Sequence, residues 1–223
     1  MLYLQHTITL GIFSLLTWGC GNSDKQKGEA EQAPLADKVW YSNPVDSDNP
    51  DPTVIKAEDG YFYLYATGGN TWIHKSKDLV HWTYVGGAYE DDKKPSWEPE
   101  AGIWAPDINY INGKYVMYYS LSKWGGGATC GIGVSVSDKP EGPFTDQGKL
   151  FRSNEIDVHN SIDPFYIEDN GKKYLFWGSW YGIWGIELTE DGLGLKGGIE
   201  NAKATKIQVA ANTGGTNAYE GSY

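Results

Sequence analysis

Short segments in which aromatic and β-branched residues alternate with polar ones recur along the chain, and no run of helical period interrupts them. The most aromatic of these segments appears in three copies, Tyr61–Tyr65, Tyr115–Tyr119 and Tyr174–Trp177. Each copy follows an Asp-Gly or Asn-Gly pair, at positions 59–60, 112–113 and 170–171. Such pairs favour the type I′ turn that joins antiparallel strands, because both central residues need a positive φ. The pattern therefore predicts three β-hairpins.

An acidic residue beside proline precedes each predicted hairpin. Asp51, Asp107 and Asp163 are separated by 56 residues each, and Glu220 follows 57 residues after the last of them. Each unit continues with a third strand that ends in a polar turn and a fourth segment that carries Trp82, Phe144 or Leu195. A repeat of about fifty residues with four short antiparallel strands is typical of a β-propeller blade.

The fold predicted is all-β, of the β-propeller kind, with blades at residues 51–106, 107–162 and 163 to about 218 and the start of a fourth near Glu220. A β-sandwich is the alternative, but a sandwich does not repeat a carboxylate at a fixed spacing. Propellers close with four to eight blades, so three blades do not complete a ring. The sequence therefore predicts either a fragment or a chain that pairs with another to cover its open edges.

The repeated carboxylates are the candidate chemistry. In a propeller the first strand of each blade lines the central channel, so equivalent residues of successive blades face one another at one mouth. Crowded carboxylates do not all stay ionised, so one is expected to keep its proton and act as an acid while another acts as a base. Two such groups about 6.5–9.5 Å apart suit inverting glycoside hydrolysis. A single Asp beside Pro often only caps a turn, but an in-phase series favours a site.

Composition narrows the classes of partner. The chain has 223 residues, with 18 Lys and Arg against 29 Asp and Glu, and the net charge of −11 would repel a phosphate backbone. Nucleic acid is therefore excluded as an expected partner. The apolar run from Ile8 to Leu16 is too short to span a bilayer. It is typical of an export signal, and the residues that follow it end in a cysteine, Cys20.

The N-terminal segment resembles a bacterial lipoprotein signal. The resemblance implies a signal peptide at residues 1–20, lipidation of Cys20, a polar tether at residues 21–38 and a folded domain from residue 39 to 223. A plain secretory signal is the alternative, and both place the protein outside the cytoplasm, in the cell envelope or secreted. Only Cys130 then remains in the body of the chain, so no internal disulfide is expected.

Four motifs together resemble glycoside hydrolase family 43, whose members are five-bladed propellers. They are Asp-Pro-Thr-Val from Asp51, Trp-Ala-Pro-Asp-Ile from Trp104, Asn-Ser-Ile-Asp-Pro from Asn160 and Tyr-Glu-Gly-Ser-Tyr from Tyr219. The resemblance implies that Asp51 is the general base, that Asp163 raises the pKa of the acid and orients it, and that Glu220 is the general acid. Asp107 matches a motif residue outside this catalytic set and is expected to be structural.

The same resemblance implies hydrolysis of α-1,5-linked arabinan, a neutral polysaccharide, by a complete protein that is monomeric. Sugar faces pack on aromatic rings, so Trp104 and Trp180 are candidate substrate-binding residues, together with Asn160 of the third motif. No cofactor is required, although the resemblance allows a calcium ion in the channel, with ligands that the sequence does not identify. His159 carries no metal assignment. The alternatives are an exo-acting α-L-arabinofuranosidase or β-xylosidase of this family and a noncatalytic glycan-binding surface lipoprotein.

Overall fold

The computed structural model of the protein describes residues 48–211. The predicted signal peptide, the tether, Cys20 and Glu220 lie outside the described residues, and their roles stay predictions. Of the two helices within residues 48–211, neither is long and apolar enough to cross a lipid bilayer.

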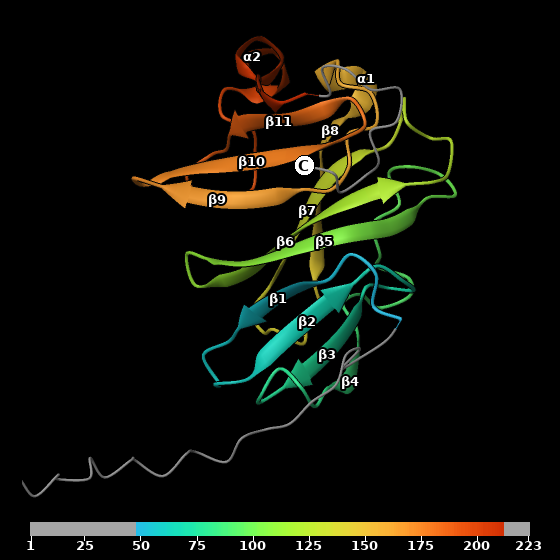
Figure 1. Cartoon of the computed structure of the whole chain (residues 1–223), viewed down its shortest axis with the longest axis vertical. Coiled ribbons are helices and arrows are strands. Elements are labelled where there is room, and N and C mark those ends of the chain that lie inside the picture. The colour runs from blue at the N-terminus through green and yellow to red at the C-terminus, as the bar shows by residue number, and fades with distance from the viewer. Residues whose placement is uncertain (1–47, 212–223) are drawn as a thin grey trace, which may run out of the picture. The chain divides into compact units, whose positions relative to one another are not determined.

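The described residues form three four-stranded sheets in which consecutive strands are antiparallel neighbours, coloured from blue through green and orange to red in Figure 1. The first sheet holds β1 (Thr53–Lys56), β2 (Phe62–Ala66), β3 (Trp72–Ser76) and β4 (Thr83–Gly87). The second holds β5 (Gly102–Ile111), β6 (Lys114–Ser122), β7 (Gly131–Ser137) and β8 (Thr145–Arg152). The third holds β9 (Phe165–Asp169), β10 (Lys172–Ser179), β11 (Gly182–Glu187) and β12 (Ile207–Ala210). Three successive four-stranded meanders are three propeller blades, as the repeat predicted.

Two of the three predicted hairpin turns have the expected geometry. Asn112 and Asn170 have φ of 50°, and the glycine after each also has a positive φ. The first turn is one residue longer, because the Ala57 amide bonds the Tyr61 carbonyl across three loop residues. There only Gly60 has a positive φ, and the Asp59 carboxylate accepts the Tyr61 amide. The prediction of a two-residue turn at Asp59-Gly60 was therefore wrong, and a three-residue loop joins these strands.

The core lies between the sheets, and β6 contributes to both of its halves. Along β6, Met117 and Tyr119 pack with Tyr63 and Tyr65 of the first sheet, because alternate side chains point to opposite faces. The residues of β6 that alternate with them pack with the third sheet, where Leu175 and Trp177 are fully buried. Burial on both faces explains why β6 is almost continuously apolar.

The fourth strand of the third sheet is not where the sequence predicted it. Leu195 makes only an isolated bridge to Leu188, and helix α2 (Gly198–Thr205) separates it from β12. A second, four-residue helix, α1 (Ser153–Ile156), follows β8. The prediction of uninterrupted strands was therefore wrong at two places. Helix α2 gave no periodic signal because it buries only Ala202.

Candidate active site

Asp51 and Asp163 occupy equivalent places in the first and third sheets. Each directly precedes a proline and the first strand of its sheet, and their φ angles are 51° and 58°. A positive φ is uncommon for a residue other than glycine, so this backbone conformation marks the two positions as related. Both side chains are exposed.

The equivalent residue of the second sheet is Ala105 and not Asp107. Ala105 precedes Pro106 and has φ of 39°, whereas Asp107 follows that proline and lies inside β5 after a bulge. The prediction that Asp107 stands in phase with Asp51 and Asp163 was therefore wrong by two residues. A spacing of 56 arose because an acid happens to lie two positions past the equivalent site in this sheet.

Contacts between the sheets confirm this register. Asp107 stands two residues after Ala105, as Thr53 stands two residues after Asp51. Each of these two side chains accepts a hydrogen bond from a backbone amide of the next sheet. The Thr53 hydroxyl lies 3.5 Å from the Ile108 amide, and the Asp107 carboxylate accepts the Tyr166 amide at 2.8 Å. Asp107 also accepts a bond from the Asn109 side chain at 2.9 Å. These contacts give Asp107 a structural position between the second and third sheets.

Burial raises the pKa of the Asp107 carboxyl to about 6. The hydrogen bonds from Tyr166 and Asn109 lower this pKa, but burial has the larger effect. The sequence predicted a raised pKa from crowding among carboxylates. Here the carboxyl with the raised pKa is 8% exposed, and desolvation is the cause. Asp107 therefore does not supply the divided pair of acid and base that the repeat suggested.

Replacing Asp107 by Asn should make the free energy of unfolding less dependent on pH, because the variant has no carboxyl to ionise at this buried position. A folded pKa above the unfolded one gives stability that is complete below the unfolded pKa, 3.8, and is lost as pH rises through about 6. The rise in pKa corresponds to about 3 kcal/mol. The variant should gain about 1–3 kcal/mol over the wild type at about pH 7.5 and nothing at about pH 4 in urea unfolding. An equal change at both pH values would contradict this account, and the exposed Asp92→Asn is the control.

Asp51 and Asp163 line one pocket of about 480 Å³. The rest of its lining consists of Pro50, Thr67, Trp104, Trp124 and Ile162. The Thr67 hydroxyl donates to the Asp51 carboxylate at 2.7 Å. The backbone amide of Asp163 donates to the Ser120 hydroxyl at 2.8 Å. The fold thus brings together two carboxylates that are 112 residues apart in the sequence, beside two large aromatic rings.

A smaller hollow of about 120 Å³ continues from the pocket. It shares Trp104 and Trp124 with the pocket and adds His159, Asn160 and Trp180. Trp180 and Asn160 therefore lie beside the aromatic pair and not among the lining residues of the carboxylate pocket. The Asn160 side chain donates to the Ser179 hydroxyl at 2.7 Å, and His159 packs against Tyr181 with ring centres 4.8 Å apart.

Trp124 is the residue of this site that sequence reasoning missed. Its side chain is 86% exposed, and its ring centre lies 5.6 Å from that of Trp104. The glycine-rich loop that carries it is held close to the residues before β9. A Cβ on Gly127 would lie 2.4 Å from the His159 ring, and the Gly127 carbonyl accepts the Asn160 amide at 2.6 Å. Glycine permits this approach. The sequence signal that could have identified Trp124 is a large aromatic residue in a glycine-rich loop, where it does not serve the hydrophobic core.

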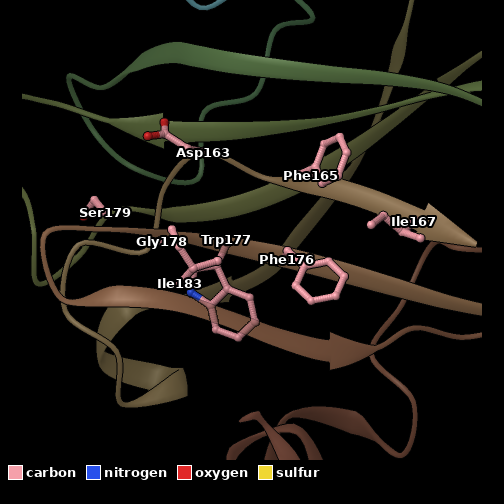
Figure 2. A pocket seen from close by; sticks show the side chains of 8 residues that line it. All are labelled: Asp163, Phe165, Ile167, Phe176, Trp177, Gly178, Ser179 and Ile183. Carbon is pink, nitrogen blue, oxygen red and sulfur yellow. The ribbon is translucent and has the colours of Figure 1, made fainter. Parts of the chain in front are cut away.

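Asp163 also lines another pocket, of about 420 Å³, which does not include Asp51. It runs along the outer face of the third sheet between β9, β10 and β11. Figure 2 shows Asp163 at one end, with Phe165 and Phe176 paired across adjacent strands and Ile167 at the far end. Apart from Asp163 and Ser179 its walls are apolar or glycine, so polar chemistry in this region is confined to the end near the carboxylates.

The described residues do not fit a channel cation by themselves. Within residues 48–211 no group of three or more His, Cys, Asp or Glu side chains could hold a metal ion. Neither Asp51 nor Asp163 has a third acidic side chain in its pocket. No step of the chemistry below is therefore assigned to a metal ion.

A pocket with two carboxylates beside paired tryptophans suits a carbohydrate, because sugar faces pack on aromatic rings and carboxyl groups can act as acid and base. Residues 41–223 match the family model described as glycosyl hydrolases family 43. The arabinan endo-1,5-α-L-arabinosidase C of Emericella nidulans is 35% identical over 192 residues, which are 82% of this chain and 58% of the relative.

Solved structures agree with this match. An exo-1,5-α-L-arabinanase from a bovine ruminal metagenomic library is 32% identical, with a TM-score of 0.59 over 70% of this chain and 56% of that one. The α-L-arabinanase of Cellvibrio cellulosa complexed with arabinohexaose is 31% identical, with a TM-score of 0.59 over 67% of this chain and 50% of that one. The chain belongs to glycosyl hydrolase family 43, a family of five-bladed β-propellers. It spans 53–60% of the length of the curated relatives that it matches.

Proposed function

We propose that the protein hydrolyses α-1,5-linked arabinan by a single displacement that inverts the anomeric configuration. The observation that carries the proposal is the pocket in which Asp51 and Asp163 lie beside Trp104 and Trp124. Relatives named as arabinan endo-1,5-α-L-arabinosidases and arabinanases support the substrate class. The chemistry uses carboxyl groups and water and requires no cofactor.

In this reaction Asp51 is the general base. Its exposed carboxylate takes a proton from a water molecule while the water oxygen attacks the anomeric carbon. Glu220 is the general acid and protonates the oxygen of the leaving sugar, so the glycosidic bond breaks as the new bond forms. Asp163 is proposed to lie near this acid, to raise its pKa by its negative charge and to orient it. Glu220 lies outside the described residues, and its role rests on the family motif.

The aromatic pair is proposed to bind the sugar chain. The faces of furanose rings carry C–H groups that pack on flat aromatic surfaces, and Trp104 and Trp124 together offer a wall that runs from the carboxylates into the smaller hollow. Trp180 and Asn160 extend the same wall. A neutral polymer suits a site whose binding surface carries few charges.

Whether the protein cuts within the polymer or from its end is open, since relatives of both names are similar to it. We expect endo action, because the curated relatives that the chain matches are named as arabinan endo-1,5-α-L-arabinosidases. Incubation of the full-length protein with debranched arabinan should then give a ladder of oligosaccharides by chromatography. Free arabinose as the first product indicates an exo-acting α-L-arabinofuranosidase. Hydrolysis restricted to xylosides indicates a β-xylosidase.

The competing class is a noncatalytic glycan-binding lipoprotein. Such a protein has no use for a base and an acid placed on either side of a bond. Retained binding of arabino-oligosaccharides without hydrolysis of arabinan, xylan or aryl glycosides would favour this class and contradict the enzyme.

The protein is further proposed to be an exported bacterial lipoprotein of the outer membrane or cell surface, attached through lipidated Cys20. Its support is the resemblance of residues 1–20 to a lipoprotein signal. Cys20→Ala should release the protein from the membrane fraction. A wild type that is already free of lipid and membrane points instead to a secreted protein. The complete protein is expected to be monomeric, with polysaccharide as its partner and no nucleic acid.

A further inference from the structure

Hydroxyl side chains stand near the end of the second strand of the first two sheets, at the rim that carries the carboxylates. Thr67 follows β2 directly, and Ser120 lies near the end of β6 and is fully buried. Each of these hydroxyls accepts a hydrogen bond from the residue that precedes proline in the following sheet. Thr67 accepts the amide of Ala105 at 2.7 Å, and Ser120 accepts the amide of Asp163 at 2.8 Å.

The direction of the proton at Thr67 follows from its partners. The Ala105 amide can only donate, so the Thr67 oxygen accepts there. The single hydroxyl proton then goes to the Asp51 carboxylate, whose oxygen lies 2.7 Å away. The Thr67 amide also donates to the Pro50 carbonyl at 2.9 Å. Thr67 therefore holds both the backbone before Asp51 and one of its carboxylate oxygens, and it is itself fixed by the second sheet.

Ser120 acts on the other carboxylate through the backbone. A positive φ at a residue other than glycine costs of order 1–3 kcal/mol and persists only where neighbouring groups fix it. Asp163 has φ of 58°, and its amide is bonded to the buried Ser120 hydroxyl of the second sheet. The bond keeps the Asp163 backbone in the conformation that presents its carboxylate to the pocket.

We propose that Thr67 and Ser120 are positioning residues that set the geometry of the two carboxylates across the two junctions between the three sheets. The inference rests on the proposed function and deepens it. Thr67 orients the carboxylate of the base Asp51, and Ser120 fixes the backbone that carries Asp163. Neither residue touches the reacting atoms in this account. Catalysis depends on placement, and an error of about 1 Å can cost about a hundredfold in rate.

The test compares kcat and KM on debranched arabinan for variants of the full-length protein. Thr67→Val keeps the shape of the side chain and removes the hydroxyl. Its kcat should fall about ten- to a hundredfold, while KM stays within about twofold, because the aromatic wall is unchanged. Thr67→Ser restores the hydroxyl and should bring kcat back to within about threefold of the wild type. Ser120→Ala should show the same loss of kcat at constant KM.

The matched control is Thr83→Val, the same change at an exposed position of β4, which should leave kcat unchanged. Thermal melting identifies variants that fail to fold, and Thr67→Ala replaces Thr67→Val in that case. A Thr67 variant without the hydroxyl that keeps the kcat of the wild type overturns the proposal. So does a loss that Thr67→Ser does not rescue.

Crystal structures of the same variants separate this proposal from the proposed function. Inactivity of the wild type on arabinan rejects the proposed function and says nothing about positioning. The structures then decide. The Asp51 carboxylate should leave its place in Thr67→Val and keep its contact of about 2.7 Å in Thr67→Ser. An Asp51 side chain in the same place in both variants overturns the inference.

Discussion

Asp51→Asn is expected to lower kcat on arabinan by about a hundred- to ten-thousandfold, the range that a general base contributes. The amide cannot take a proton from water, so the attack loses its base. The fold should not change, because asparagine tolerates a positive φ and its side-chain oxygen still accepts the bond from Thr67. Rates of release of reducing ends, measured beside the melting temperature, check both statements.

The control for this prediction is Asp92→Asn, the same loss of charge at an exposed position outside the pocket. It should keep the activity of the wild type. The measurement on Glu220→Ala tests the proposed acid in the same way. If Asp51→Asn hydrolyses arabinan at the rate of the wild type, then Asp51 is not the base.

Arg152→Met is expected to destabilise the protein by about 3–5 kcal/mol, because it leaves a buried carboxylate without its main partner. Arg152 lies at the end of β8, where its guanidinium bonds the Glu98 carboxylate and the carbonyls of Trp97 and Thr129. Glu98 is 7% exposed. Burial opposes its ionisation, but the bonds from Thr129 and Arg152 outweigh burial and lower its pKa. Urea unfolding at neutral pH measures the loss.

The matched variant is Glu98→Gln combined with Arg152→Met. It removes the Glu98 charge that the single variant leaves unpaired, so it should recover a large part of the lost free energy of unfolding. A double variant as unstable as the single one would show that the cost lies in packing against Trp97, whose ring lies 5.3 Å from the guanidinium, and not in the unpaired charge.

The features of the fold that the sequence predicted are local. Asn-Gly pairs and alternating aromatic residues determine a hairpin within about fifteen residues, and the Asn112 and Asn170 turns have the predicted geometry. The loop at Asp59 is longer by one residue, so Lys56 pairs with Phe62 and not with Tyr63. Helix α2 was missed because an exposed helix with one buried residue carries no apolar period.

The site was predictable only in part, because its register depends on contacts between sheets. Asp51 and Asp163 are marked by the proline that follows each of them, and the structure brings both to one pocket. Asp107 precedes no proline, and the bulge in β5 that shifts it cannot be read from the spacing alone. Trp124 reaches the pocket through a glycine-rich loop whose course depends on the close approach of Gly127 to His159. No local pattern encodes such an approach.

The pocket lined by Asp51 and Asp163 is proposed to carry out a single displacement on an arabinan chain. Proton NMR of the anomeric signals in the first minutes of hydrolysis tests it most directly, before the released sugar equilibrates between its two forms. Cleavage of an α-linkage with water held by Asp51 should release the β-configured reducing end first. Initial release of the α-form would show retention through a covalent intermediate and would contradict the account.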